Sequence, residues 1–592
     1  MNGGKKFITV ETVLYLAIAA LAAWLRLANL GFLPLTNSEA AHALTAASVT
    51  PSASPFLDGE GVTALSPAYN TLTASLFHLM DASDAGARFF PAMAGLALVL
   101  VPILIRRRLG HPTAITLSLI FAISPVLVTT SRTAGGASLA SLGLVTSIAL
   151  LMGVEEGEDN RKRIGWAGAA LGLSLASGAT TFQGLLAIGV AVIYPLVRRY
   201  RSGGKRIGWL RNDQTRWGLW IALGVMVAIA TGFGFYFSGI AGLADSLADW
   251  ITGWGTAGEI PALTALAMVP IYEPLVLLFG IIGAYNALRE RDSLGLAAVS
   301  WASGGLLVML AYPARVGSDL IWVIIPLATL AARSLVSLVE RIARRRTWQE
   351  FIGLTCLLLI LMAYAYLQLA AYASGIGPAF DVIDRDIRLW MFFGVLFLIG
   401  VVLVLFGLGW SWSLAGESAG LAVCMAFIAL NVVACWRLNF PTSGASAQEL
   451  WRPQVSTPGM RLMVKTLETI SQSHTGRKDA LGVKIYGEAT PSLAWALRRF
   501  PVAGSVGEQA ADPAPAFVTR EGEEMPALSA EYTGQGLKIG ERWGWDGVLP
   551  TDILTWWVLR QASTQPERWI LFVRLDIASL GEIGWSGIEV RP

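Results

Sequence analysis

The sequence predicts an all-α polytopic membrane domain with about 13 transmembrane helices, followed by a C-terminal α/β soluble domain. Three observations lead to this fold class. The mean hydropathy is +0.57 and only 14% of the residues are charged, whereas soluble domains carry roughly 25%. Apolar runs of about 20 residues, long enough to cross a bilayer, recur as far as Trp436. After Phe440 the composition changes abruptly to mixed polar and apolar residues.

The predicted spans are the apolar runs between polar or basic segments. The first run follows Lys5 and Lys6 and ends in Trp24-Leu25-Arg26 rather than in a small-residue cleavage site. We therefore interpret it as an uncleaved spanning helix and not as a signal peptide. The predicted spans lie near residues 12–30, 89–105, 112–130, 137–153, 164–178, 182–197, 216–237, 265–287, 294–312, 320–339, 349–373, 389–409 and 415–436.

Positive charge predicts the orientation of the chain. The basic clusters between the runs all fall on the side of Lys5 and Lys6 if successive helices alternate in direction. Short loops rich in Lys and Arg stay in the cytoplasm. We therefore expect a multi-pass protein of the cell membrane, with a cytoplasmic N-terminus and an extracytoplasmic region after Arg437. The clusters are Arg106 to Arg108, Arg161 to Arg163, Arg198 to Arg201, Arg289 with Arg291, and Arg341 to Arg346.

The segment from Pro67 to Met80 is apolar enough to suggest a further span. Counting it would move every later basic cluster to the opposite side of the membrane. We therefore expect a helix that lies along the outer membrane surface. With this choice, the loops that face outward are residues 31–87, 131–136, 238–264, 313–319 and 374–388.

The predicted membrane domain comprises residues 1–439 and the predicted extracytoplasmic domain residues 440–592. Helical and alternating patterns follow one another after residue 440, as is typical of a small α/β domain. We expect Gly534-Gln535-Gly536 to be a turn rather than a phosphate-binding loop. The predicted helices are 458–473 and 492–500, and the predicted strands are 483–486, 516–519 and 570–573. Tryptophans that fill a core or an interface, or stack on sugar rings, are Trp543, Trp545, Trp556, Trp557, Trp569 and Trp585.

Several kinds of site find no support in the sequence. There is no HExxH, DxD, Walker or GxSxG pattern. Cys356, Cys424 and Cys435 all lie inside apolar runs without metal-type spacing, as expected of buried thiols. We therefore predict no metal site and no cofactor. The net charge of +3 is too small to indicate a nucleic-acid partner.

Polar side chains crowd the predicted outward side, several of them near helix ends. Such residues are costly in a membrane protein and indicate function. A carboxylate can act as general base on an acceptor hydroxyl, and an arginine can bind a lipid-linked phosphate through two parallel hydrogen bonds. These two groups, with access from the lipid, are what glycosyl transfer from a polyprenyl phosphate requires. The outward residues are Glu39, His42, Asp58, Glu60, Arg88, Arg132, Glu259, Tyr272, Glu273, Arg315 and Asp319.

Structural interpretations stand beside these functional ones. Asn37 or Ser38 could cap a short helix, whose dipole favours an acidic residue such as Glu39 in the first turn. His42 lies on the same helix face as Glu39 and binds substrate or is incidental. Arg88 and Arg132 lie at span ends and could reach lipid headgroups. Asp58 and Glu60 fit a solvated stretch.

A series of short motifs connects these residues. They are Trp24-Leu25-Arg26-Leu27, Ser38-Glu39-Ala40, Ser66-Pro67-Ala68-Tyr69, Arg88-Phe89-Phe90-Pro91, Ser124-Pro125, Ser131-Arg132, and Asp319-Leu320-Ile321-Trp322 with Pro326. In this order they resemble the integral-membrane GT-C glycosyltransferases, specifically family 39, the protein O-mannosyltransferase and aminoarabinose-transferase-like group. The similarity is dense over residues 15–200 and thinner over 200–440. The chain departs from the family in its first outer loop, where Ser38-Glu39 stands in place of two adjacent acids.

The resemblance implies a GT-C-like membrane domain that moves a sugar, with anomeric inversion, from a polyprenyl-phosphate donor to a protein, lipid or glycan acceptor on the outer face. Glu39 is then the catalytic candidate, as the base or as the group that orients the acceptor. The candidates for phosphate binding are Arg88, Arg132 and Arg315. Tyr69, Tyr272 and Trp322 would line the sugar site. The remaining substrate-binding candidates are His42, Glu273 and Asp319.

Two other functional classes stay open on the sequence alone. A transporter or flippase for a lipid-linked glycan predicts charged residues at mid-membrane depth and an inverted repeat. The predicted spans are nearly free of charge between their ends and show no such repeat. A non-catalytic scaffold would instead use the region after residue 440 to hold a partner.

Overall fold

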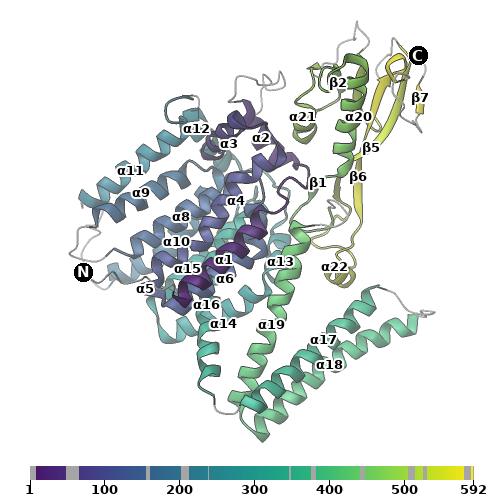
Figure 1. Cartoon of the computed structure of the whole chain (residues 1–592). Coiled ribbons are helices and arrows are strands. Elements are labelled where there is room, and N and C mark those ends of the chain that lie inside the picture. The colour runs from purple at the N-terminus through teal and green to yellow at the C-terminus, as the bar shows by residue number, and fades with distance from the viewer. Residues whose placement is uncertain are drawn as a thin grey trace.

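The computed structural model describes residues 9–48, 66–154, 160–201, 213–237, 239–345, 348–374, 382–440, 447–503, 514–523, 530–578 and 588–590. A large bundle of helices forms the first part of the chain, and a sheet with short helices follows it (Figure 1). The elements up to residue 201 are α1 (Val10–Leu27), α2 (Asn37–Ser48), α3 (Pro67–Leu79), α4 (Asp84–Leu100), η2 (Val101–Ile105), α5 (Arg106–Leu109), α6 (His111–Ile123), α7 (Pro125–Ser131), α8 (Ala137–Met152), α9 (Arg161–Leu175) and α10 (Ala179–Arg201).

The helices of the second half of the bundle lead to the start of the sheet region. They are α11 (Asp213–Ala230), α12 (Gly239–Thr252), α13 (Ala262–Tyr272), α14 (Pro274–Glu290), α15 (Ser293–Ala311), η4 (Gly317–Leu320), α16 (Ile321–Ala343), α17 (Trp348–Ser374), α18 (Val382–Gly409) and α19 (Trp412–Asn439). Figure 1 shows α17 and α18 as a long pair that leaves the bundle. The central helix of the bundle is α16, most of whose side chains are buried.

Each of the thirteen predicted spans coincides with a helix or with consecutive helices. Seven helices in the described part of the chain are long and apolar enough to cross a bilayer, or up to nine if each of two bent pairs is one span. The helix α8 and residues 179–192 of α10 are apolar but shorter. The chain is thus a multi-span membrane protein, and the count of thirteen stays a prediction. The expected surface helix at 67–80 is α3, whose place along the membrane surface also stays a prediction.

Two of the predicted spans are broken by proline. The helices α6 and α7 meet at 59° where Pro125 begins α7, and α13 and α14 meet at 92° where Pro274 begins α14. A proline has no N–H and favours the first position of a helix. The predicted span at 265–287 therefore consists of two helices, because the chain turns by about a right angle at Glu273, and its crossing of the membrane stays a prediction.

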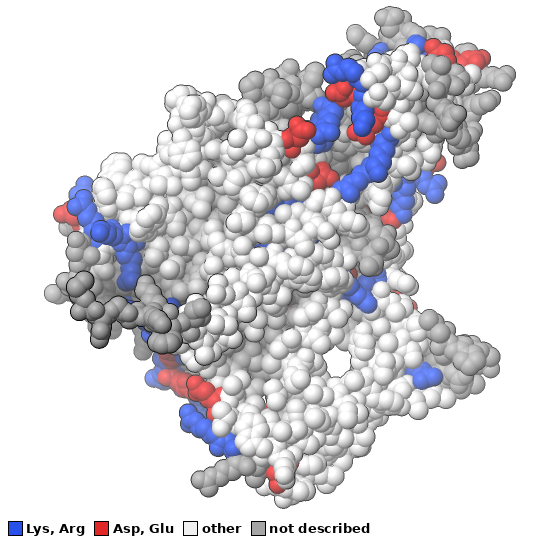
Figure 2. Space-filling model, viewed as in Figure 1, with Lys and Arg blue, Asp and Glu red and all other residues white. Residues whose placement is uncertain are grey.

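Charged residues gather at opposite edges of the helical bundle. Figure 2 shows a broad surface without Lys, Arg, Asp or Glu between charged patches on the left and at the upper right. At one end of the bundle, Glu11 at the start of α1 lies 3.6 Å from Arg106 and 3.0 Å from His111. The N-terminal end of α1 and the first basic cluster therefore lie at the same end of the bundle, as the charge pattern predicted.

A sheet of seven strands forms the C-terminal region. Its order is β1-β5-β6-β4-β2-β3, and β7 pairs with β5. The strands β2, β3 and β4 are parallel, whereas β1, β5, β6 and β7 pair antiparallel with their neighbours. The strands are β1 (Gln454–Ser456), β2 (Val483–Tyr486), β3 (Val502–Ala503), β4 (Ala516–Arg520), β5 (Tyr532–Trp543), β6 (Thr564–Arg574) and β7 (Ile588–Val590), and the helices are α20 (Pro458–Thr475), α21 (Pro491–Leu497), α22 (Ile553–Leu559) and α23 (Leu575–Ala578).

The α/β class predicted for this region is confirmed, and one local prediction is wrong. The residues Gly534 to Gly536 lie inside β5 rather than in a turn, with Gly534 opposite Phe572 and Gly536 opposite Ile570 in β6. Of the predicted tryptophans, Trp545, Trp556 and Trp569 are buried, which fits core packing. Trp585 lies outside the described residues. The domain boundary at 439/440 stays a prediction.

The C-terminal region contacts the bundle on at least two sides. On one side Arg461 of α20 donates to the carbonyl oxygen of Phe32 at 2.7 Å and lies 3.1 Å from Asp84. On the other side α22 packs on α17 through an apolar cluster that contains Leu369 and Val558. These contacts hold the sheet region against the helical bundle.

Candidate active site

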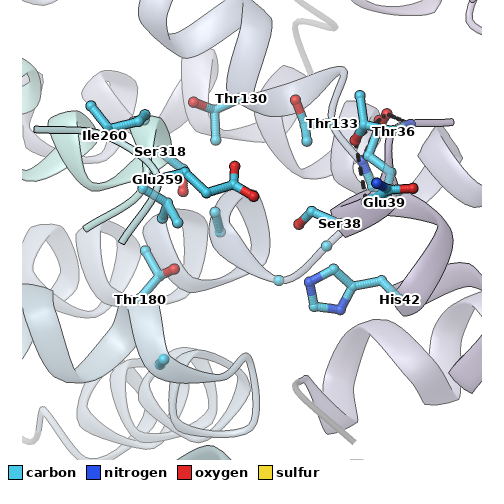
Figure 3. A pocket seen from close by; sticks show the side chains of 18 of the residues that line it. Thr36, Ser38, Glu39, His42, Thr130, Thr133, Thr180, Glu259, Ile260 and Ser318 are labelled. Carbon is cyan, nitrogen blue, oxygen red and sulfur yellow. Dashed lines mark hydrogen bonds between the residues drawn. The ribbon is translucent and has the colours of Figure 1, made fainter. Parts of the chain in front are cut away.

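A cavity of about 360 Å³ lies where one end of the helical bundle meets the start of the sheet region. Its walls come from segments far apart in the sequence, among them α2, the loop after α7, the loop before α13 and the stretch after residue 450. Figure 3 shows polar side chains facing this space from several sides. The polar or charged lining residues are Thr36, Asn37, Ser38, Glu39, His42, Ser66, Thr130, Thr133, Ser177, Thr180, Asp249, Glu259, Arg315, Ser318, Arg452 and Gln454.

Glu39 forms the edge of the cavity as half of a buried ion pair. Its Oε1 accepts from Arg88 Nε and its Oε2 from Arg88 Nη2, both at 2.7 Å. Arg88 also donates to the carbonyl oxygens of Leu30, Leu33 and Pro34. Because a guanidinium has five N–H groups, these contacts occupy all the nitrogens of Arg88. It therefore holds the first outer loop rather than facing the cavity.

Glu39 also caps its own helix. The Thr36 hydroxyl accepts from the Glu39 amide, and the Glu39 carboxylate accepts from the Thr36 amide at 3.0 Å. This reciprocal pair is a capping box. The predicted cap at Asn37 or Ser38 is thus wrong, since the capping hydroxyl is that of Thr36. A further donor is the amide of Ala134 at 3.1 Å, which ties α2 to the loop after α7.

These donors fix the charge of Glu39. Burial raises the pKa of the carboxyl group, but Arg88 and the two backbone amides more than offset this and bring the pKa to about 2. A general base works best with a pKa near the operating pH. Both oxygens already accept hydrogen bonds from the protein, so the geometry does not fit the predicted role of Glu39 as base.

The stability of the protein is expected to fall when the pH drops below about 4.5. The pKa of Glu39 lies at about 2 in the folded chain against an ordinary 4.5, so its contribution is complete above pH 4.5 and is lost as the pH falls toward 2. The difference corresponds to about 3 kcal/mol. Thermal unfolding of the purified chain between about pH 6 and about pH 3 measures it. Glu39→Gln should flatten the pH dependence, while Glu488→Gln at an exposed position should leave it unchanged. Equal slopes in the unchanged chain and both variants would refute the assignment.

Arg132 also makes structural contacts within the protein. Its Nη1 donates to the carbonyl oxygens of Leu25, Arg26 and Ala28 at the end of α1, and its guanidinium lies 4.6 Å from the ring centroid of Phe440. Carbonyl groups at a helix C-terminus carry partial negative charge and bind cations. Arg132 does not line the cavity, so the structure does not place it for the predicted phosphate contact.

His42 lines the cavity and Tyr69 stands behind it. The two rings lie 5.7 Å apart, edge to face, and the Tyr69 hydroxyl donates to the carbonyl oxygen of Ala87 at 2.9 Å. Burial lowers the pKa of His42 to about 4, so its imidazole is neutral at neutral pH. The His42 Nδ1 atom is buried without a hydrogen-bond partner in the described structure.

Three further predicted residues are buried in the walls rather than exposed to the cavity. The Tyr272 hydroxyl donates to Glu449 at 2.7 Å. Asp319 accepts from the Val316 amide and so caps the short helix before α16. Trp322 donates to the Thr180 carbonyl oxygen at 2.9 Å. Since Val316 and Thr180 line the cavity, Asp319 and Trp322 position its walls.

Glu273 is also fully buried, at the right-angle break between α13 and α14. Its carboxylate accepts from the Ser124 hydroxyl and from the Val126 amide at 3.0 Å. These two residues begin α7 after its own break. Glu273 therefore joins the two broken helices, and it does not line the cavity.

Two carboxylates of the cavity have no cationic partner among the described residues: Glu259 and Asp249. Glu259 is exposed, and Figure 3 shows its side chain on the wall opposite Ser38 and His42. Burial and the neighbouring Asp245 raise the pKa of Asp249. Glu259 lies in the predicted outward loop 238–264 and was among the outward polar residues, but it was not among the predicted catalytic or substrate-binding residues.

Two guanidinium groups of the cavity keep their charge without an ion pair to a described carboxylate. Arg315 donates to the carbonyl oxygens of Met309, Ile260 and Leu310, which leaves part of its N–H groups free. Arg452 makes no side-chain hydrogen bond to any described residue. Burial lowers the pKa of both. Arg452 was missed because it follows the last span and was assigned to a separate soluble domain.

The described residues contain no group of three or more His, Cys, Asp or Glu side chains placed to hold a metal ion. The expectation that the protein uses no cofactor stays a prediction. The chemistry that the cavity itself offers is that of two cationic groups and two carboxylates beside a neutral imidazole. Such a set suits an anionic ligand together with a hydroxyl group that gives up a proton.

Residues 42–237 match the family model described as dolichyl-phosphate-mannose-protein mannosyltransferase. The resemblance to glycosyltransferase family 39 is confirmed. The matched range contains α3 to α11 and the last residues of α2, and so includes His42, Tyr69, Arg88 and Arg132. No curated protein gives a significant sequence match.

Solved structures of other proteins share the fold of this chain. The crystal structure of ArnT from Cupriavidus metallidurans in the apo state has a TM-score of 0.53 and 15% identity, and the match covers 97% of this chain and 100% of that chain. The structure of the same protein bound to undecaprenyl phosphate has a TM-score of 0.52 and 16% identity, over 86% of this chain and 93% of that chain. The predicted GT-C-like membrane fold with a C-terminal α/β region is therefore confirmed.

Proposed function

We propose that the protein is a membrane glycosyltransferase that moves a sugar from a polyprenyl-phosphate donor to an acceptor on the extracytoplasmic face. The observation that carries the proposal is the cavity of about 360 Å³, which brings the unpaired carboxylate of Glu259 together with the guanidinium groups of Arg315 and Arg452. The family match supports the reaction type, and the bound undecaprenyl phosphate of ArnT supports the class of lipid carrier.

The phosphate of the donor would lie against Arg315 and Arg452. The predicted assignment to Arg88 and Arg132 is replaced, because protein carbonyls and Glu39 occupy the guanidinium group of Arg88 and because Arg132 does not line the cavity. A guanidinium held by carbonyl oxygens on one side can still present N–H groups to a phosphate on the other. Arg315 has this arrangement, and Arg452 has all its side-chain donors available.

Glu259 would accept the proton of the acceptor hydroxyl. The acceptor oxygen forms a bond to the anomeric carbon as the bond from that carbon to the phosphate oxygen breaks. The electron pair of the broken bond leaves with the polyprenyl phosphate, whose negative charge Arg315 and Arg452 stabilise. A single displacement of this kind inverts the anomeric carbon, as the family resemblance implies.

Glu39 and Arg88 would act as positioning residues. Their ion pair connects the loop at residues 30–36, the start of α2 and the amide of Ala134. The side chains of Ser38 and His42 project from the same helix into the cavity. A rigid α2 keeps this wall opposite Glu259, which is the geometry that catalysis by proximity needs.

The purified chain is expected to release free polyprenyl phosphate from at least one sugar-charged donor when an acceptor is present. The experiment uses a panel of polyprenyl-phosphate sugars with the protein in detergent or nanodiscs, and follows the released carrier by mass spectrometry. Arg452→Ala and Arg315→Ala should raise the KM for the donor, whereas Arg499→Ala on the outer surface should not. Donor movement across a bilayer without cleavage of the sugar–phosphate bond would replace the proposal by a flippase.

A further inference from the structure

A second cavity, of about 320 Å³, lies close to the candidate active site but is lined by other residues. The break between α13 and α14 forms one wall, and α17, α19 and α22 form the others. Tyr272 stands between the two spaces, since its ring contacts Trp451 of the first cavity and the guanidinium of Arg560 of the second. Figure 1 shows α22 beside α19 and above α17.

The walls of this second cavity are apolar and reach the outer surface of the bundle. They are made by side chains such as Ile271, Phe427 and Leu430. Val433 of α19 is 47% exposed and Tyr366 of α17 is 41% exposed, and both α17 and α19 are helices able to span the bilayer. In a membrane, the cavity is therefore open to lipid between these two helices.

Two arginines stand at the end of the cavity next to α22. Arg437, in the last turn of α19, donates through Nη1 to the Val558 carbonyl oxygen at 3.0 Å. Arg560, at the end of α22, is 11% exposed, and its Nη1 lies 3.6 Å from Glu449, too far for a hydrogen bond. This nitrogen is buried without a hydrogen-bond partner in the described structure. Buried donors without a partner are rare in native proteins and indicate an additional ligand.

The charges at this end leave one positive charge uncompensated. Arg437 and Arg560 carry two positive charges and Glu449 carries one negative charge, so the balance of these three groups is one positive charge. A phosphodiester carries one negative charge. A planar guanidinium binds its oxygens through parallel hydrogen bonds, and basic pockets between spanning helices bind anionic lipid headgroups.

We propose that the second cavity binds an anionic phospholipid of the bilayer, with its phosphodiester on Arg437 and Arg560 and the upper part of an acyl chain against the apolar walls. The bound lipid would connect α22 to α17 and α19 and so fasten the C-terminal region to the membrane helices. This site is separate from the donor site, because Tyr272, Glu449 and Trp451 lie between them. The proposal does not depend on the proposed glycosyl transfer.

Native mass spectrometry of the full chain, purified in detergent and stripped of lipid, tests the proposal. We expect one molecule of phosphatidylglycerol to bind at least ten-fold more tightly than phosphatidylcholine. Arg437→Ala removes a charge-assisted contact and should weaken phosphatidylglycerol binding about ten-fold or more. Val433→Trp fills the cavity from its exposed side, keeps both arginines and should weaken binding to a similar extent.

The matched control is Arg388→Ala in α18, because Arg388 belongs to the neighbouring helix pair and contacts Gln368 of α17 outside the cavity. Its binding of phosphatidylglycerol should equal that of the unchanged chain. Equal binding of phosphatidylglycerol by the unchanged chain and by all three variants would overturn the proposal. Displacement of the lipid by inorganic phosphate at the same concentration would indicate a site for free anions, and stronger binding of polyprenyl phosphate would assign the cavity to the carrier; either result also overturns it.

Discussion

Replacing Glu259 with glutamine is expected to lower the turnover rate of sugar transfer by about 10²- to 10⁴-fold, the usual range for loss of a general base. The side chain is exposed in the cavity and makes no hydrogen bond or ion pair to a described residue. Its removal should therefore leave the fold and the KM for the donor nearly unchanged. The measurement is kcat and KM for polyprenyl-phosphate release with a saturating acceptor.

Two matched variants make this result specific. Glu488→Gln changes an exposed carboxylate of the C-terminal region that does not line the cavity, and it should keep full turnover. Asp249→Asn changes the second unpaired carboxylate of the cavity. If Asp249→Asn loses turnover while Glu259→Gln keeps it, the base is Asp249. Full activity in both variants would refute a carboxylate base at this wall of the cavity.

Replacing Arg88 with alanine is expected to destabilise the protein by about 3–5 kcal/mol, the usual cost of removing one partner of a buried ion pair. The carboxylate of Glu39 would stay buried without its cation, and the carbonyl oxygens of Leu30, Leu33 and Pro34 would lose their donor. Thermal unfolding of the purified chain measures the loss.

The double variant separates the ion pair from the rest of the site. Glu39→Ala with Arg88→Ala should be less destabilised than the sum of the two single variants, because neither charge is left unpaired. Arg106→Ala is the control. The Arg106 side chain is 42% exposed and lies 3.6 Å from Glu11, and surface pairs contribute roughly 1 kcal/mol or less. A loss of under about 1 kcal/mol for Arg88→Ala would contradict the structural role given to this ion pair.

The helices were predictable because a bilayer limits what can cross it. An apolar run of about 20 residues has few ways to satisfy its backbone other than a spanning helix, and each predicted run coincides with helix. The proline breaks escaped prediction because Pro125 and Pro274 can bend a helix or begin one. At the break before Pro274, Glu273 accepts hydrogen bonds from Ser124 and Val126 across the bundle, and these contacts hold the bend.

The strands of the C-terminal region were also predictable only in part. The segments at 483–486, 516–519 and 570–573 are short and rich in apolar residues, and they are β2, β4 and part of β6. Gly534 and Gly536 resembled a turn because glycine is common there. Both lie in β5, and at Gly534 the ring of Phe572 fills the space beside the backbone, where a Cβ atom would approach it to 2.5 Å. Only the pairing with β6 reveals this.

The sequence by itself determined which residue types gather at the outer end of the bundle, since polar groups there stand out against apolar helices. It could not determine which of them are paired. Glu39 and Arg88 are 49 positions apart in the chain and form one buried ion pair, while Glu259 and Arg452 come from distant segments and have no ion-pair partner among the described residues. The tertiary structure decided this division, because the charge state and the accessibility of a side chain depend on neighbours that only folding brings within hydrogen-bond distance.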